Sequence, residues 1–294
     1  MEKYIATLIT LGVAFVPLYA AVVCLEAWHW YRKRKPFRSP LTRALLRSPG
    51  ETLRRQIDDL TWDLSTWLAL LMVMPLLLYA TYLSQAYLGG VNASPWMFAF
   101  LAVAVFFFVL YQLIKAGKKR RYLLQGLDGE LAVGQELTEL LKDGMSVFHD
   151  VQCGRFNIDH VVIGSAGVFA VETKARAKLK TGRGKADVAV KVDGDRLLFP
   201  NWTETQWVDQ ARRQAQWLAN WLKTAAGESV EVKAVLALPG WYIEVTKPSD
   251  VFVLNPRNPR LLTQAGKAPL SAEQVRHITA ALEQHCRDVE AHEI

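Results

Sequence analysis

Three long apolar segments are the feature that most constrains the fold of this 294-residue chain. They run from Tyr4 to Leu25, from Thr66 to Leu88 and from Trp96 to Lys115, and their interiors contain no charged residue. A helix needs about 20 apolar residues to cross about 30 Å of hydrocarbon, and each segment is close to that length. We therefore expect residues 1–121 to form a membrane domain with three transmembrane helices.

The charges between these segments predict their orientation. The basic stretches RKRKPFRSPLTRALLR and KAGKKRRY follow the first and third segments, whereas GGVNAS, between the second and third, is uncharged. Basic loops stay in the cytoplasm, so we expect a multi-pass protein of the cell (inner) membrane with a basic cytoplasmic loop and a cytoplasmic C-terminal domain. The alternative is that the first segment is a cleaved signal peptide, which would leave RKRKPFR on the far side of the membrane.

Charge and cysteine content restrict the function classes. Residues 1–121 carry 15 Lys and Arg against 6 Asp and Glu, whereas residues 122–294 carry 20 against 22. The basic excess is therefore mainly a topology signal and does not indicate nucleic-acid binding by the whole chain. The three cysteines are far apart and have no metal-ligand spacing, so we expect no structural zinc and a reducing compartment.

Residues 122–294 have the pattern of one soluble α/β domain with a mixed sheet. Helical spacing of apolar residues, or a capping signal, marks three helices, and short apolar runs mark strands between them. The expected helices are 126–141, 204–223 and 271–290, and the expected strands are 146–151, 157–163, 168–173, 187–192, 196–199, 231–238 and 250–254. The stretch 240–268 is otherwise expected to be loops.

One hairpin of this domain carries charges in an otherwise apolar sequence, IDHVVIGSAGVFAVETK. If the loop is Gly164–Gly167, or only Ser165–Ala166, Asp159 lies opposite Glu172, and Lys174 projects from the same face. Two carboxylates side by side favour a cation between them, and hard oxygen ligands suit Mg²⁺ or Mn²⁺. The alternative is a solvated sheet end where Lys174 neutralises the acids.

These residues belong to an ordered set that resembles the nuclease-related domain family, NERD, of the PD-(D/E)xK nuclease superfamily. The resemblance covers roughly residues 126–224. Its motifs are GLDGE at 126–130, DHVVIG with Gly167-Val-Phe, VETK at 171–174, and Gln210 with Gln214. Gln206-Trp207 stands where the family often has Asn-Pro.

The resemblance implies a restriction-endonuclease-like fold, a central mixed sheet flanked by helices, and metal-dependent hydrolysis of phosphodiester bonds. Asp159 and Glu172 would hold the metal, with Glu130 as an additional ligand or its supporting partner. Lys174 would orient water or stabilise charge on the phosphoryl group, and Gln210 would position water or phosphate. His160 points to the opposite sheet face and is expected to be structural.

The predicted partners are nucleic acid, DNA rather than RNA, and the lipid bilayer, with a homo-oligomer or protein partner left open. A basic segment after the hairpin can contact phosphates, although its charge pattern also fits a solvated loop. Its basic residues are Arg176, Lys178, Lys180, Arg183 and Lys185.

We thus expect a membrane-anchored nuclease that defends against or processes foreign DNA, because a tethered enzyme meets substrates that reach the membrane. One alternative is a catalytically inactive module, tethered to the membrane, that binds nucleic acid or protein. A transporter or channel is disfavoured, because such proteins usually carry ionisable residues inside their spans.

Overall fold

The structure is a computed structural model. It describes residues 20, 23–24, 27–28, 30–31, 43–88, 94–178, 184–264 and 269–289, except for the side chains of Leu88, Lys185 and Ala186. The expected first span, Tyr4–Leu25, and its signal-peptide alternative lie outside the described residues apart from single positions.

The chain separates into two compact units. The first comprises Met1–Pro40, Asp58–Arg120 and Glu293–Ile294, and the second comprises Leu41–Ile57 and Arg121–His292. The predicted division into residues 1–121 and 122–294 stays a prediction. In the structure, the segment Leu41–Ile57 groups with the second unit, which also holds the hairpin.

Two long helices contain the second and third expected spans. Helix α2 is Glu51–Leu83 and is followed by the π-helical turn η1, Ser84–Leu88, whereas α3 is Pro95–Leu137 and ends in the 3₁₀ turn η2, Thr138–Asp143. Both are long and apolar enough to cross a membrane. That they cross a membrane stays a prediction, because the core helix of a soluble protein can be equally long and apolar.

The helix expected over 126–141 is wrong in its start, because it is the end of α3 and not a separate element. The connecting sequence KKRRYLLQ consists largely of strong helix formers, and single glycines at 117 and 126 cost only about 1 kcal/mol each in a helix. The helix therefore continues without a break from Pro95 to Leu137.

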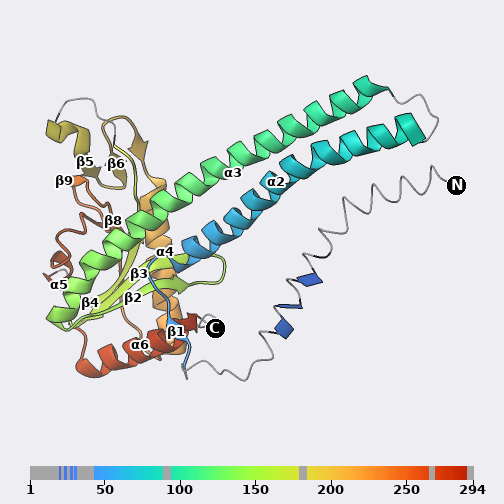
Figure 1. The fold of residues 1–294 in the computed structure, drawn as a ribbon. Helices are drawn as coiled ribbons and strands as arrows, with labels where there is room; N and C mark the ends of the chain where they lie inside the picture. Colours follow the sequence, from blue (N-terminus) through green and yellow to red (C-terminus); the bar gives the residue numbers. More distant parts are fainter. Residues whose placement is uncertain are drawn as a thin grey trace. The chain divides into compact units, whose positions relative to one another are not determined.

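A central mixed sheet is confirmed (Figure 1). Its strand order is β10-β8-β4-β3-β2, with β2, β3 and β4 antiparallel and β4, β8 and β10 parallel. The strands are β2 Ser146–Gln152, β3 Asn157–Gly164, β4 Gly167–Thr173, β8 Val232–Ala237 and β10 Phe252–Leu254.

The hairpin formed by β3 and β4 has the expected register. Its loop is the two residues Ser165–Ala166, and the pairs run from Gly164↔Gly167 to His160↔Val171. Gly167 has φ +129°, a backbone conformation that side-chain-bearing residues rarely adopt. A two-residue loop fixes which residues face each other, so the hairpin sets the face on which each charged side chain lies.

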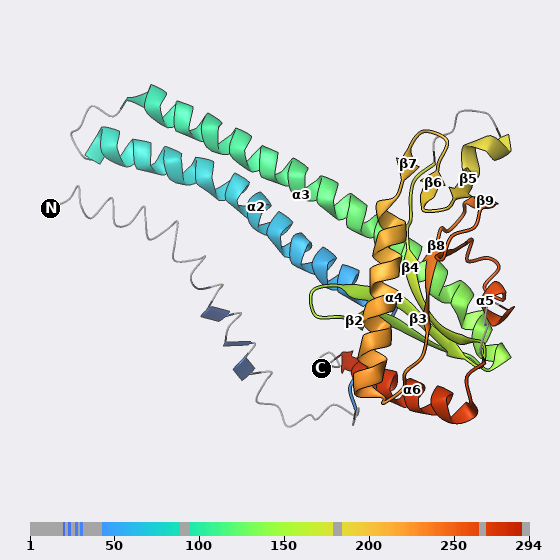
Figure 2. The same ribbon diagram turned by 180° about the vertical axis from the view of Figure 1, so that it is seen from behind.

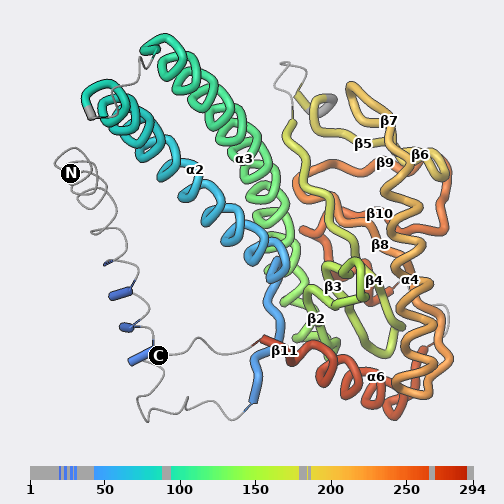
Figure 3. Tube along the Cα trace, turned by 90° about the vertical axis from the view of Figure 1, so that its right-hand side faces the viewer, coloured from blue at the N-terminus to red at the C-terminus, as the bar shows by residue number. Residues whose placement is uncertain are grey.

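The sheet lies between two helical layers, which Figures 2 and 3 show from behind and from the side. Val168 and Ala170 of β4 pack in the cluster that includes α4, Gln206–Ala225, whereas Phe169 and Val171 pack in the cluster that includes the last turns of α3. Alternation along β4 therefore directs even-numbered residues toward α4 and odd-numbered residues toward α3.

A second, four-stranded sheet has the order β7-β6-β5-β9. The strands expected at 187–192 and 196–199 form its centre, so they are correct as strands but do not join the central sheet. The edge strand β9 lies in the stretch expected to be mostly loops. The elements are η3 Gly184–Val188, β5 Ala189–Asp193, β6 Arg196–Leu198, β7 Thr203–Glu204, β9 Tyr242–Lys247 and the short helix α5 Leu261–Gln264.

The helix expected over 271–290 ends earlier than predicted, and a short strand follows it. Helix α6 is Ala272–His285, and Ser271 and Gln274 form the predicted capping box. The chain then forms β11, Arg287–Val289, which pairs antiparallel with β1, Leu45–Leu46. These residues do not continue the helix, because their backbone N–H and C=O groups form hydrogen bonds with β1 instead.

Candidate active site at the end of strand β4

The predicted charges meet at the carboxyl end of β4. The β3–β4 ladder ends at His160↔Val171, while β4 continues beside β8 to Thr173↔Ala237. Beyond the ladder, the Thr173 backbone N–H donates to Asp159 Oδ2 at 2.7 Å. The Asp159 side chain therefore bonds to the β4 backbone where the strand pairing stops, which places its carboxylate beside Glu172.

Glu172 is held by three donors. Lys174 Nζ and Gln210 Nε2 donate to Oε1 at 2.6 and 2.7 Å, and Gln214 Nε2 donates to Oε2 at 2.5 Å. The two glutamines are one turn apart on α4, so they present their amides to the same point. Glu172 itself is only 3 % exposed. The carboxylate is therefore fixed by contacts from both β4 and α4.

Glu130 approaches from the α3 layer. Beside it, Gly129 allows a close approach, since an added Cβ would lie 2.4 Å from Ala175 Cβ and 3.6 Å from Thr173 Cγ2. Burial, with the nearby charges of Asp150 and Glu172, raises the pKa of the Glu130 carboxyl to about 8. Glu130 Oε2 is buried and has no hydrogen-bond partner among the residues that the structure describes.

Burial and like charge raise the pKa values of two of these carboxyl groups. Burial, followed by the charges of Glu172 and Glu130, raises the pKa of Asp159 well above its usual range. The Thr173 N–H and the charge of Lys174 act in the opposite direction. Hydrogen bonds thus join Glu172 to Lys174 and Gln210, and the strand register sets Asp159 opposite Glu172. Glu130 is connected to this group through its charge, which acts on Asp159, and not through a hydrogen bond to it.

The carboxylates have the chemistry of a magnesium site. Their oxygens are hard ligands, their repulsion would be relieved by a cation, and Glu130 Oε2 is free to accept one. Within the described residues, however, no group of three or more His, Cys, Asp or Glu side chains is arranged to hold a metal ion. Mg²⁺ commonly uses only one or two carboxylates and keeps several waters, so the donor set fits such a partial site.

The predicted phosphate-binding segment is only partly described. Arg176 lies over the Trp207 ring at 5.2 Å, and Lys178 lies over the Trp241 ring at 5.6 Å and donates to the Gly240 carbonyl. Both remain exposed at the surface. Lys180, Arg183 and the side chain of Lys185 lie outside the described part of the chain.

His160 lies on the sheet face opposite Asp159, as alternation predicts. It is fully buried, and its Nδ1 lies 2.8 Å from Nδ1 of His149. Burial lowers the pKa of both rings, to about 4 for His149, so the pair is neutral at pH 7 with one ring donating to the other. This contact gives Nδ1 of His160 a partner, whereas its buried Nε2 has none among the described residues. The ring lies on the other sheet face from Asp159, as expected for a structural histidine.

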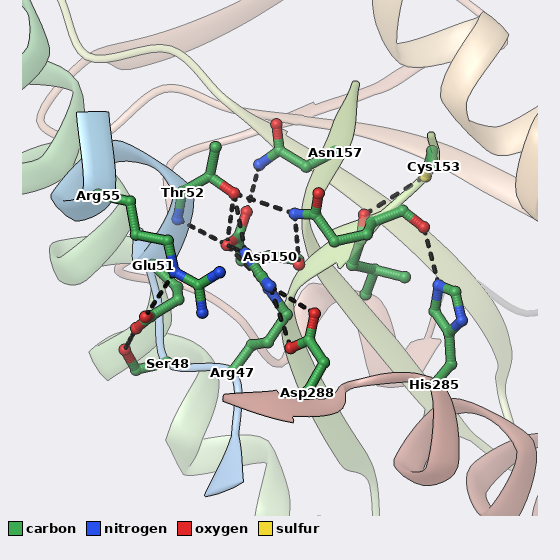
Figure 4. Close-up of polar contacts among 12 residues, drawn as sticks. Arg47, Ser48, Glu51, Thr52, Arg55, Asp150, Cys153, Asn157, His285 and Asp288 are labelled. Atoms are coloured by element: carbon green, nitrogen blue, oxygen red, sulfur yellow. Dashed lines mark hydrogen bonds and ion pairs between the residues drawn. The ribbon is translucent and has the colours of Figure 1, made fainter. Parts of the chain in front are cut away.

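A second buried polar network was not anticipated from the sequence (Figure 4). Arg47 Nη2 and Nε donate to Asp150 Oδ2 at 2.7 and 3.1 Å, and Arg47 Nη1 donates to Asp288 at 2.8 Å. Thr52 donates to the same Asp150 oxygen through its N–H and its hydroxyl, and Asn157 donates to Oδ1. The network joins the segment before α2 to β2 and β11.

Local sequence signals for this network are weak. Arg47 lies in a basic stretch that membrane topology already explains, and Asp150 lies in a short strand where a half-exposed acid is ordinary. Asp150 has φ +49°, which is rare for a residue other than glycine, but a single sequence does not reveal this. Gln214 was part of the resemblance without a stated role, and in the structure it holds Glu172.

Comparison with known proteins adds one finding. Neither the curated proteins nor the solved structures include a match to this chain. The five clustered residues, from Glu130 to Gln210, all lie inside the segment that matches a family model. That segment is residues 125–239, and the model it matches is the nuclease-related domain, NERD.

Proposed function

We propose that this protein is a membrane-anchored, metal-dependent nuclease that hydrolyses phosphodiester bonds of nucleic acid, DNA rather than RNA. The nuclease-related domain supports the reaction class. The observation that carries the proposal is a buried Glu172, paired with Lys174 at 2.6 Å, with the carboxyls of Asp159 and Glu130 near enough for their charges to interact. Buried like charges are costly to folding, so their retention at one point indicates a functional site.

Asp159, Glu172 and Glu130 would hold Mg²⁺ or Mn²⁺, which supplies an acidic bound water and stabilises negative charge on the phosphoryl oxygens. Gln210 and Gln214 orient Glu172, so their role is to keep that carboxylate in place when substrate binds. Lys174 is bonded to Glu172 and its side chain is 21 % exposed, which leaves its ammonium able to face a phosphate.

The membrane anchor and the substrate are part of the same proposal. The two long apolar helices support an anchor in the cell membrane. Arg176 and Lys178, which follow directly after Lys174, would contact the phosphate backbone without reading bases. A tethered enzyme acts on nucleic acid that reaches the membrane, which suits incoming foreign DNA.

Cleavage assays test the proposal directly. The full chain, purified in detergent, would be incubated with labelled single- and double-stranded DNA and RNA, with Mg²⁺, with Mn²⁺ or with chelator. We expect metal-dependent cleavage that Lys174→Ala reduces by about 10²–10³-fold, the usual loss when a group that stabilises transition-state charge is removed. Lys223→Ala, an exposed lysine in the last turn of α4, is the matched control. Equal cleavage by both variants, or none by the wild type, would refute the catalytic assignment.

A second candidate function is a binding module that keeps the nuclease fold without catalysis. Two observations favour it: both Glu172 oxygens already accept hydrogen bonds, and the described residues contain no group of three metal-ligating side chains. Such a module would retain labelled DNA in chelator, and Lys174→Ala would leave this binding unchanged. Binding that requires Mn²⁺ would argue against it.

A further inference from the structure

One face of α3 is shaped to receive another segment of the chain. Gly126, Glu130 and Gly134 are four residues apart, so they lie in a row on the helix. An added Cβ at Gly134 would lie 2.7 Å from Pro49 Cγ, and one at Gly126 would lie 3.2 Å from Leu53 Cδ1. Residues 49 and 53 thus pack against the turns on either side of Glu130, and the two glycines make this approach possible.

Gly50 lies opposite Glu130 in this contact. Its φ is +72°, and an added Cβ would lie 2.3 Å from Leu127 Cδ1 and 3.8 Å from Glu130 Oε2. The position therefore demands glycine for its backbone conformation and for space. As a result, main chain and not a side chain borders the carboxyl of Glu130, which is only 7 % exposed.

The covering segment is anchored at both of its ends. On one side, Arg47 is 5 % exposed and is bonded to Asp150 and Asp288. On the other side, the Thr52 N–H donates to Asp150 Oδ2 at 2.7 Å. The same aspartate therefore secures both flanks of Pro49 and Gly50, and the segment is fixed over α3 by contacts that burial protects from water.

We propose that the segment Arg47–Leu53 is the positioning element for Glu130, an integral part of the nuclease-related site although it precedes the span expected at Thr66–Leu88 and lies outside residues 125–239. The inference deepens the proposed function and rests on it for the role of Glu130. Helix α2 begins at Glu51, so its first residues belong to the segment that covers Glu130. Displacement of the first turn of α2 is thereby passed to the carboxylate cluster.

A pair of opposed substitutions tests this inference in the full chain in detergent. Gly134→Ala adds a methyl group against Pro49, and Pro49→Ala removes ring atoms from the same contact, so the double variant restores part of the fit. Gly117→Ala is the matched control, because it is the same substitution in the same helix and its Cβ would meet nothing within 4 Å. Helical propensity alone predicts that both Gly→Ala variants are stabilised.

The readouts are Mn²⁺ affinity, the rate of Mn²⁺-dependent cleavage of labelled double-stranded DNA, and hydrogen exchange of peptides covering residues 47–53 and 126–134. We expect Gly134→Ala to lower affinity and rate at least tenfold and to increase exchange in both peptides together. The double variant should recover part of the loss, and Gly117→Ala should match the wild type. Wild-type behaviour of Gly134→Ala, or a loss that the double variant does not recover, would overturn the inference.

Hydrogen exchange separates this inference from the proposed function. If the wild type neither binds Mn²⁺ nor cleaves any substrate, the proposed function fails, and the exchange data alone decide. Joint loss of protection in Gly134→Ala with recovery in the double variant would still establish that residues 47–53 hold the Glu130 turn. Independent behaviour of the two peptides would refute it.

Discussion

Two buried clusters of charged side chains in the same unit balance their charges in opposite ways. In the first, Asp150 is fully buried and accepts five hydrogen bonds from Arg47, Thr52 and Asn157. In the second, Glu172 pairs with Lys174, Asp159 accepts a backbone N–H, and Glu130 Oε2 has no partner in the described part of the chain. We call the first the complete network, because the charged groups of Arg47 and Asp150 all have partners. We call the second the incomplete cluster, because it contains three carboxylates and one lysine.

The difference separates a structural network from a functional site. A buried ion pair with every atom bonded holds segments together, and its loss is felt as instability. A cluster of carboxylates with raised pKa values weakens the fold and is retained where chemistry requires it. The Arg47 guanidinium illustrates the complete network. Burial lowers its pKa, but hydrogen bonds and charge from Asp150 and Asp288 more than offset this, so its pKa lies above the usual value.

The largest expected effect comes from breaking the complete network. Arg47→Ala leaves Asp150 buried without a cation, and we expect a loss of about 3–5 kcal/mol in the free energy of unfolding of the second unit. Thermal or urea unfolding of the full chain in detergent would measure it. A loss below about 1 kcal/mol would mean that water replaces the guanidinium and that the network is less closed than its burial indicates.

Adding charge to the incomplete cluster should have the opposite effect. With Mn²⁺ at about 100 times its dissociation constant, we expect a gain of about 2.7 kcal/mol, because the cation binds only the folded state. Asp159→Asn should remove most of this gain, while Lys223→Ala, an exposed lysine in the last turn of α4, should retain it. An equal Mn²⁺ effect in wild type and Asp159→Asn would place the bound ion elsewhere.

Glu130→Gln tests what it costs to bury a charged Glu130 among other carboxylates, without any metal. The pKa of Glu130 is about 8 in the folded state against 4.5 for the free side chain, so the unfolded chain loses this proton first as pH rises. Folding stability therefore falls between about pH 4.5 and pH 8 and stays low above it. We expect Glu130→Gln to be more stable than the wild type by roughly 1–3 kcal/mol at pH 9 and nearly equal at pH 4.

Stability measured from pH 4 to pH 9 in chelator gives this comparison. A difference that grows as pH falls would reverse the sign of the argument and would indicate that the folded state prefers the ionised Glu130.

Sequence reasoning reached the incomplete cluster more readily than the complete one, for a physical reason. A short loop and a period of two fix the hairpin register, so the relative positions of Asp159, Glu172 and Lys174 follow from local pattern. Glu130 and Gln210 lie on other elements, and only the resemblance connected them to the hairpin.

The complete network depends on contacts that local pattern cannot reveal. Arg47 and Asp150 are 103 positions apart, and Arg47 and Asp288 are 241 apart. The strand β11 escaped prediction for the same reason, because its three residues continue a helical pattern until β1 pairs with them. Membrane topology already accounted for the basic residues near position 47. Nothing in the local sequence therefore indicated that Arg47 also bonds Asp150 and Asp288.

The smallest effect separates burial from charge. Arg55 lies eight residues after Arg47, and it pairs with Glu51 at 3.3 Å with its side chain 52 % exposed. Arg55→Ala removes an i,i+4 pair in water, and we expect a loss of only about 0.3–0.5 kcal/mol. High salt should reduce even this, whereas the loss in Arg47→Ala should persist, because the buried pair is screened much less. The contrary result is that Arg47→Ala and Arg55→Ala lower the free energy of unfolding equally and respond alike to salt. Burial would then not determine the strength of the Arg47 network, and the two clusters would differ only in their numbers of charges.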